Sequence, residues 1–368
     1  MKKLVPALYI HIPFCTSICS YCDFPKLLSK TNYQDAYLNR LILELSKIGQ
    51  KEFETIYIGG GTPSSLSVEQ LELLLSFIES LFQVNQEYSF EANPESLTLE
   101  KIKLLKKHKV NRVSLGVQTF SEGSLKLLNR KHTKEDVFEC VSNLQSEGID
   151  NINLDFIFGL KIENQSDYLN NICTASKLGV KHISYYSLQI EEGTKLFKTP
   201  NVRKDPDDLA DDYEYIVKAL RENGYHQYEV SNFSQETFES KHNLTYWRNQ
   251  EYYGIGLGAT GLVDSHRMAQ TRNILKFIEN KDTVISDVYE DLEETEFNYL
   301  MLNLRLVQGF ELGEFKDIFK KDFLQAYKVE LEDLKDDLII TDKRVSVVPQ
   351  KLFILDAILV DLLHFKEQ

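Results

Sequence analysis

The chain has 368 residues, of which 42% are hydrophobic and 27% are charged, so it can form one large or two moderate globular domains. Its net charge of −14 argues against a nucleic-acid-binding surface, because such a surface has to neutralise phosphates. The apolar runs are far shorter than a membrane span, and Pro6 stands where a signal peptide needs its apolar core, so we expect a cytoplasmic protein without a membrane span.

The first predicted element is a strand at residues 8–12, where β-branched and aromatic residues alternate, and it leads into a loop with three cysteines. Cys15, Cys19 and Cys22 fall within eight residues, and their odd number disfavours a disulfide framework. Two explanations remain: a structural zinc site with His11 as the fourth ligand, or an iron–sulfur cluster held by three thiolates. A [4Fe–4S] cube with three protein ligands leaves one iron open to another ligand.

Predicted helices and strands then alternate as far as residue 189. Helices are expected near residues 35–48, 68–82, 99–107, 124–128, 134–145 and 168–177, and strands at 53–58, 88–93, 113–118, 152–158 and 183–189. Cys140 and Cys173 lie on two of these helices and are expected in the core. Six successive β-then-α units predict an α/β fold of parallel strands with right-handed crossovers. Such strands form either a closed or partly closed barrel or a doubly wound open sheet.

Polar residues recur at the carboxyl ends of these strands. They are Gly60, Gly61 and Thr62 after the second strand, Glu91 and Gln118 at the ends of the third and fourth, Asp155 within the fifth, and Gln189 at the end of the sixth. A carboxylate or amide inside an apolar strand is costly unless it is hydrogen-bonded. Because the carboxyl ends of parallel strands meet at one edge, the set predicts a ligand site there. No Gly-Lys-Ser/Thr follows the glycines, which disfavours a nucleoside triphosphate.

The spacing Cys15-x3-Cys19-x2-Cys22 directly after a first strand resembles that of the radical S-adenosylmethionine (SAM) superfamily. The surrounding YIHIPFC resembles the group that contains oxygen-independent coproporphyrinogen III oxidase and the HemW-type haem chaperones. The resemblance implies a partial (β/α)6 barrel, a [4Fe–4S] cluster on the three cysteines, SAM on its open iron, and an electron donor such as flavodoxin or ferredoxin. It also implies a SAM site formed by Tyr9, Tyr21, Gly60, Gly61, Thr62, Glu91, Gln118, Arg130, Asp155 and Gln189. Arg130 suits a bidentate pair with the methionine carboxylate.

The remaining sequence is less regular. His242–Trp247 resembles the HNxxYW motif of HemW-type proteins, although its residue types also fit a buried aromatic beside a bonded His and Asn. In the glycine-rich stretch 254–261, Thr260 stands where the family pattern has His, which puts a porphyrin or metal role of this position in doubt. From about residue 292, amphipathic helices and short strands predict a small, mainly helical, winged-helix-like domain that covers the open side of the barrel. We expect a core domain at 1–235, a connecting segment at 236–290 and a cover domain at 291–368.

Two functions from different classes fit these features. The favoured one is a haem chaperone that binds the cluster, SAM and haem and transfers haem to an unknown acceptor protein. The alternative is the oxidase, which decarboxylates coproporphyrinogen III to protoporphyrinogen IX. The oxidases carry a further cysteine two residues after the third one, where this chain has Phe24, so we expect oxidase activity to be absent. His242 is the first candidate haem ligand, with His11 and His266 as weaker candidates. The sequence leaves open whether radical chemistry is retained.

Overall fold

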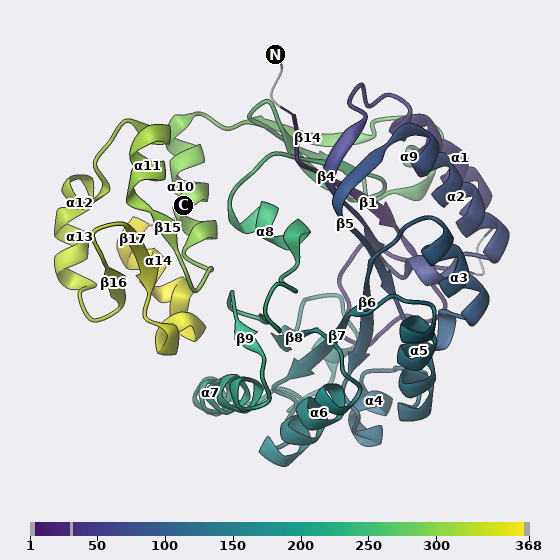
Figure 1. Ribbon diagram of the computed structural model, residues 1–368, viewed down its shortest axis with the longest axis horizontal. Helices are drawn as coiled ribbons and strands as arrows, with labels where there is room; N and C mark the ends of the chain where they lie inside the picture. Colours follow the sequence, from purple (N-terminus) through teal and green to yellow (C-terminus); the bar gives the residue numbers. More distant parts are fainter. Residues whose placement is uncertain (1–3, 30–31, 364–368) are drawn as a thin grey trace.

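The main sheet is built on six parallel strands whose order in space follows their order in the chain (Figure 1). The structure is a computed structural model that describes residues 4–29 and 32–363. The six strands are β1 (Ala7–Ile12), β4 (Glu52–Gly60), β5 (Gln83–Ala92), β6 (Arg112–Gln118), β7 (Asn151–Phe158) and β8 (His182–Ser187). Each pairs in parallel with the next, so their carboxyl ends lie at one edge.

Helices between these strands, and one after the last of them, cover the outer face of the sheet (Figure 1). They are α1 (Gln34–Leu45), α2 (Val68–Leu81), α3 (Leu99–Lys107), α4 (Glu122–Leu127), α5 (Lys134–Ser146), α6 (Gln165–Lys177) and α7 (Pro206–Glu222), with 3-10 turns η1 (Pro63–Ser65), η2 (Pro94–Ser96) and η3 (Leu196–Lys198). Ser67, Thr133 and Asn164 each form a capping box that fixes a helix start. Alternate strand residues such as Ile56 and Phe90 join the helices in one core, which leaves the other face of each strand for the interior of the barrel.

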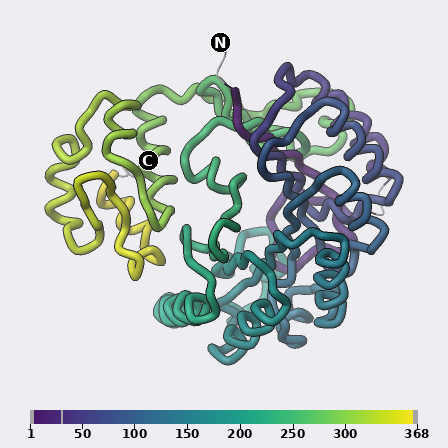
Figure 2. Tube along the Cα trace, viewed as in Figure 1, coloured from purple at the N-terminus to yellow at the C-terminus, as the bar shows by residue number. Residues whose placement is uncertain are grey.

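Later parts of the chain extend both edges of this sheet. β10 (Asn232–Ser234) and β9 (His226–Gln227) continue it antiparallel beyond β8, and β11 (Tyr252–Ile255) pairs in parallel with β1. Beyond β11 the order continues with β12 (Thr260–Val263), β13 (His266–Gln270) and β14 (Val284–Tyr289), while α8 (Lys241–Trp247) and α9 (Ile274–Ile278) are helical. Figure 2 shows this green stretch of the tube beside the purple first strand. The segment expected as a connection therefore contributes four strands to the main sheet.

The C-terminal residues pack around a core of their own, which includes Leu300, Phe315 and Val345. Their elements are α10 (Leu292–Asn303), α11 (Leu312–Phe319), α12 (Phe323–Ala326), α13 (Lys328–Asp333), η4 (Pro349–Ile354) and α14 (Leu355–Leu363), with a sheet of β15 (Phe310–Glu311), β17 (Arg344–Val347) and β16 (Leu338–Ile340). In Figure 1 this unit stands beside the barrel, on the side where α8 lies. The predicted α/β fold of parallel strands with a smaller, mainly helical C-terminal unit is confirmed.

Two details complete the fold. The predicted sixth strand is too long, because β8 ends at Ser187 and Gln189 lies in the loop beyond it. Among the described residues, no helix has the length and apolar character needed to cross a membrane.

Candidate functional site

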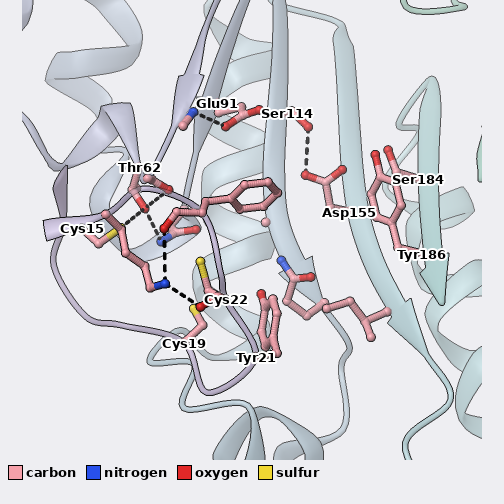
Figure 3. A pocket seen from close by; sticks show the side chains of 18 of the residues that line it. Cys15, Cys19, Tyr21, Cys22, Thr62, Glu91, Ser114, Asp155, Ser184 and Tyr186 are labelled. Carbon is pink, nitrogen blue, oxygen red and sulfur yellow. Dashed lines mark hydrogen bonds between the residues drawn. The ribbon is translucent and has the colours of Figure 1, made fainter. Parts of the chain in front are cut away.

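A cavity of about 670 Å³ occupies the interior of the six parallel strands and reaches the loops at their carboxyl ends. The predicted site residues that line it are Cys15, Cys19, Cys22, Tyr21, Gly60, Gly61, Thr62, Glu91, Gln118, Arg130, Asp155 and Gln189. Figure 3 shows the cysteines on one side and Asp155, Ser184 and Tyr186 across from them. The fold thus brings nearly all of the predicted residues to one cavity.

The three cysteines lie on a loop that is tied back to itself. Short strands at its ends, β2 (Phe14–Cys15) and β3 (Leu27–Leu28), pair with each other. Within the loop, Nζ of Lys26 donates to the carbonyl oxygens of Cys22 at 2.5 Å and Phe24 at 3.3 Å. Burial raises the pKa of the Cys15 thiol to about 11, and burial also raises the pKa of Cys22. Thiolates at these positions therefore need a metal, because coordination to a cation deprotonates a thiol.

The glycine loop after β4 is tied to Glu91 near the end of β5. The Glu91 carboxylate accepts hydrogen bonds from the hydroxyl of Tyr57 at 2.7 Å and from the N–H of Gly60 at 2.9 Å. Gly60 has a φ of +122°, which favours glycine, and a Cβ at Gly61 would lie 2.9 Å from Sγ of Cys15. Burial raises the pKa of Glu91 to about 7, although both hydrogen bonds oppose the rise. Glu91 can therefore change its charge near neutral pH.

Arg130 and Gln118 stand beside the cysteine loop. Arg130 donates to Sγ of Cys19 at 3.4 Å, to Oδ1 of Asn93 at 2.7 Å and to the carbonyl oxygen of Gly116. Its Nε is buried and has no hydrogen-bond partner among the described residues. Gln118 is buried with a φ of +69°, a left-handed conformation that costs a non-glycine residue energy and is found at functional sites. Both residues thus lie at the end of the cavity where the cysteine loop is.

Asp155 anchors a set of polar side chains on the inner faces of β6, β7 and β8. Its carboxylate accepts hydrogen bonds from Oγ of Ser114 at 3.0 Å and from Nδ2 of Asn153 at 2.7 Å, as Figure 3 shows for Ser114. Nδ2 of Asn153 also donates to Oγ of Ser184 at 3.0 Å. Burial raises the pKa of Asp155, and the hydrogen bonds from its neighbours oppose that rise. The wall opposite the cysteines is therefore polar and internally hydrogen-bonded.

Tyr9 and the two weaker histidine candidates do not line the cavity. The hydroxyl of Tyr9 is hydrogen-bonded to Nδ1 of His11 at 2.9 Å, and Nε2 of His11 donates to the carbonyl oxygen of Pro25 at 3.0 Å. Both ring nitrogens of His11 are thus occupied, and burial lowers its pKa to about 4. His266 lies on β13, where it contacts Asp287 at 2.8 Å. Neither histidine is placed to bind a group in the cavity.

His242, the first candidate haem ligand, is completely buried behind the cavity wall and does not line the cavity. Its Nδ1 is hydrogen-bonded to Oγ1 of Thr55 at 2.7 Å and its Nε2 to the hydroxyl of Tyr246 at 2.8 Å. Its ring stacks on Tyr57 with centroids 5.0 Å apart, and Tyr57 in turn donates to Glu91. In this arrangement His242 offers no free nitrogen to iron, and one of its hydrogen bonds has to break before it can act as a ligand.

The helix that carries His242 is seated on Glu87, a buried residue of β5. The Glu87 carboxylate accepts hydrogen bonds from the N–H groups of Lys241 at 2.9 Å and His242 at 3.2 Å, and from Oγ of Ser240 at 3.3 Å. A carboxylate at the first turn of a helix satisfies otherwise unpaired N–H groups. The HNxxYW segment is therefore fixed to the base of the barrel.

The sequence analysis missed several residues of the cavity: Tyr57, Asn93, Arg112, Ser114, Asn153, Ser184, Tyr186 and Asn243. Three of them lie at even spacing before a predicted site residue of the same strand. Arg112 and Ser114 precede Gln118 in this way, and Asn153 precedes Asp155. Side chains two apart on a strand share a face, so this spacing was a usable signal.

A sequence profile of the radical SAM superfamily matches residues 9–172. Among solved structures, the coproporphyrinogen III oxidase HemN from Escherichia coli, described as a radical SAM enzyme, aligns with a TM-score of 0.84 at 19% identity, over 97% of this chain and 90% of that chain. This likeness shows the fold. The superfamily implies a [4Fe–4S] cluster and SAM, and the cavity has groups that fit both.

The fit rests on three observations. Three thiols on one loop line the cavity, the glycine loop leaves no room for a Cβ beside Cys15, and the buried Nε of Arg130 lacks a partner among the described residues. The described ranges contain no group of three or more His, Cys, Asp or Glu side chains placed to hold a single metal ion.

Curated relatives match over most of the chain. The Heme chaperone HemW of Lactococcus lactis subsp. lactis is 39% identical over 352 residues, which cover 92% of this chain and 92% of the relative. The Heme chaperone HemW proteins of Bacillus subtilis and Escherichia coli are 37% and 34% identical, and the alignments cover 92% and 86% of this chain. The similarity extends through the barrel and into the C-terminal unit. The chain belongs to the HemW family of the radical SAM superfamily.

Proposed function

We propose that the protein is a haem chaperone of the cytoplasm, which binds a [4Fe–4S] cluster, SAM and haem and transfers haem to an acceptor protein. The observation that carries the proposal is the 39% identity to a protein named Heme chaperone HemW over 92% of both chains. The cavity supports it, because cysteines and polar side chains suited to the cluster and to SAM line one space.

Different residues of the cavity bind the cluster and the separate parts of SAM. Cys15, Cys19 and Cys22 hold the cluster, which supplies an open iron and, with an electron from a donor such as flavodoxin or ferredoxin, reducing power toward SAM. Backbone at Gly60 and Gly61 approaches the methionine part of SAM without side-chain interference. Glu91 and Asp155 accept hydrogen bonds from amino or ribose hydroxyl groups, with Tyr21, Thr62, Gln118 and Gln189 completing the cavity wall. Arg130 pairs with a carboxylate.

Phe24 favours the chaperone over the oxidase. Its side chain is 69% exposed and lines the cavity beside the cysteine loop, where the oxidases carry a further thiol. A phenyl ring has no acidic proton and no sulfur, so it cannot replace the thiol in binding a substrate or in a radical reaction. The fold shared with HemN leaves oxidation of coproporphyrinogen III as the second candidate function. For the haem iron, His242 remains our proposed ligand, on the condition that it leaves Thr55 or Tyr246.

Two assays on the anaerobically reconstituted protein test the proposal. Titration with haem should give a Soret band, and the loaded protein should then transfer haem to an apo-haemoprotein. Incubation with coproporphyrinogen III, SAM and reduced flavodoxin should give no protoporphyrinogen IX. Turnover to protoporphyrinogen IX would establish the oxidase instead. A protein that neither binds haem nor converts coproporphyrinogen III would exclude both functions.

A further inference from the structure

The cavity is lined by a buried guanidinium group that has no role in the assignments above. Arg112 begins β6 and is only 2% exposed, yet it lines the cavity. It lies on the same face of the strand as Ser114, two residues further on. Figure 3 shows Ser114, Asp155 and Ser184 across the pocket from the three cysteines. Arg112 therefore belongs to the side of the cavity away from the cluster loop.

This guanidinium is not paired within the described part of the chain. Its Nε is buried without a hydrogen-bond partner there, and no ion pair joins it to a carboxylate of a described residue. Burial opposes its charge, but the nearby Glu87 and Asp155 carboxylates more than offset burial and raise the pKa of Arg112, so the guanidinium stays charged. Both are used by other donors, since Glu87 accepts from the N–H of Lys241 and Asp155 from Ser114 and Asn153.

Buried N–H donors without acceptors are costly, so a protein keeps them where a ligand supplies the missing acceptors. A planar guanidinium presents parallel N–H donors, which match the two oxygens of a carboxylate. Asn243 of α8 lines the same cavity and adds an amide group. The other arginines that line the cavity lie at the cysteine loop, where Arg130 donates to Cys19 and Arg272 donates to a carbonyl oxygen of the loop. Arg112 thus marks a separate place for negative charge.

We propose that the inner side of the cavity is a carboxylate-binding subsite in which Arg112 is the charged donor. This inference rests on the proposed function, because the ligands expected in the cavity are SAM and haem. SAM carries one carboxylate, on its methionine part, for which Arg130 is the competing partner, and haem carries two propionates. Arg112 contacts one of these carboxylates and so fixes the orientation of the molecule that carries it.

Calorimetric titration of the reconstituted protein distinguishes the two sources. Each ligand is compared with a counterpart that lacks a free carboxylate: SAM with decarboxylated SAM, and haem with haem dimethyl ester. Arg112→Gln should weaken binding of one carboxylate-bearing ligand about ten- to a hundredfold, and should leave its counterpart unchanged. Arg112→Lys, which keeps the charge but not the planar fork, should show a smaller loss for the same ligand.

Equal weakening of both members of each pair would overturn the proposal and make Arg112 a structural residue, and so would unchanged binding of all four compounds. Thermal unfolding of each variant shows whether it folds, and Arg112→Lys decides the question if Arg112→Gln does not. A wild-type protein that binds no haem would contradict the proposed function, while the pair formed by SAM and decarboxylated SAM would still decide the role of Arg112.

Discussion

Replacing Tyr57 with phenylalanine should weaken SAM binding in a pH-dependent way. The change keeps the ring but removes the 2.7 Å hydrogen bond to Glu91. A hydrogen bond to a charged group contributes about 1.5–3 kcal/mol, and about 1.4 kcal/mol corresponds to one pH unit of pKa. The pKa of Glu91, which burial raises to about 7, should therefore rise to about 8–9 in the variant. Near pH 7 the ionised fraction of Glu91 then falls from about one half to about one tenth or less.

SAM affinity should follow that fraction, because a neutral carboxyl group is a weaker acceptor, so binding should weaken about five- to fiftyfold near pH 7. Raising the pH ionises Glu91 in the variant as well as in the wild type. The loss of SAM affinity in the variant should therefore shrink to about fourfold or less at about pH 8.5. Anaerobic calorimetry at both pH values measures this loss of affinity. Titration of SAM itself affects both proteins equally, so it cancels in the ratio of the two affinities.

Tyr88→Phe is the matched control, because the Tyr88 hydroxyl is buried on β5 without a hydrogen-bond partner among the described residues. It should bind SAM like the wild type. Equal weakening of Tyr57→Phe at both pH values would show that Tyr57 acts through packing alone. Unchanged affinity at both would show that SAM makes no use of the Glu91 charge.

Three further predictions concern the cluster, the haem ligand and the seat of α8. Cys15→Ser should abolish the cluster. Cys140 lies on α5 and is buried in the protein core, so Cys140→Ser should retain about four irons and four sulfides per chain by chemical analysis. His242→Ala should lose the Soret band of bound haem and Thr55→Val, which frees Nδ1, should strengthen it; an unchanged spectrum in His242→Ala would exclude this residue as the ligand. Glu87→Gln should lower the free energy of unfolding by about 1–3 kcal/mol, seen as a lower melting temperature, because the neutral amide accepts weaker hydrogen bonds from the first turn of α8.

The parallel sheet could be predicted because its elements are encoded locally. The helix expected at 99–107, for example, is α3, Leu99–Lys107. The recurrence of polar residues at the carboxyl ends of the strands also predicted a shared site, and most of those residues line the cavity. β11 could not be predicted in this way, since it is short and depends on pairing with β1 from the far end of the chain. The burial of His242 likewise depends on Thr55 and Glu87, which no local pattern connects to it.

The position of β1 inside the sheet limits how the chain can be shortened. β1 pairs with β4 on one side and with β11 on the other, and β11 (Tyr252–Ile255) follows all six parallel strands in the chain. A truncated protein that ends before Tyr252 leaves one edge of β1 without its partner, directly before the cysteine loop. Unpaired edges of apolar strands recruit other chains. The same exposure occurs during translation, until Ile255 has left the ribosome, so the nascent barrel passes through an aggregation-prone stage.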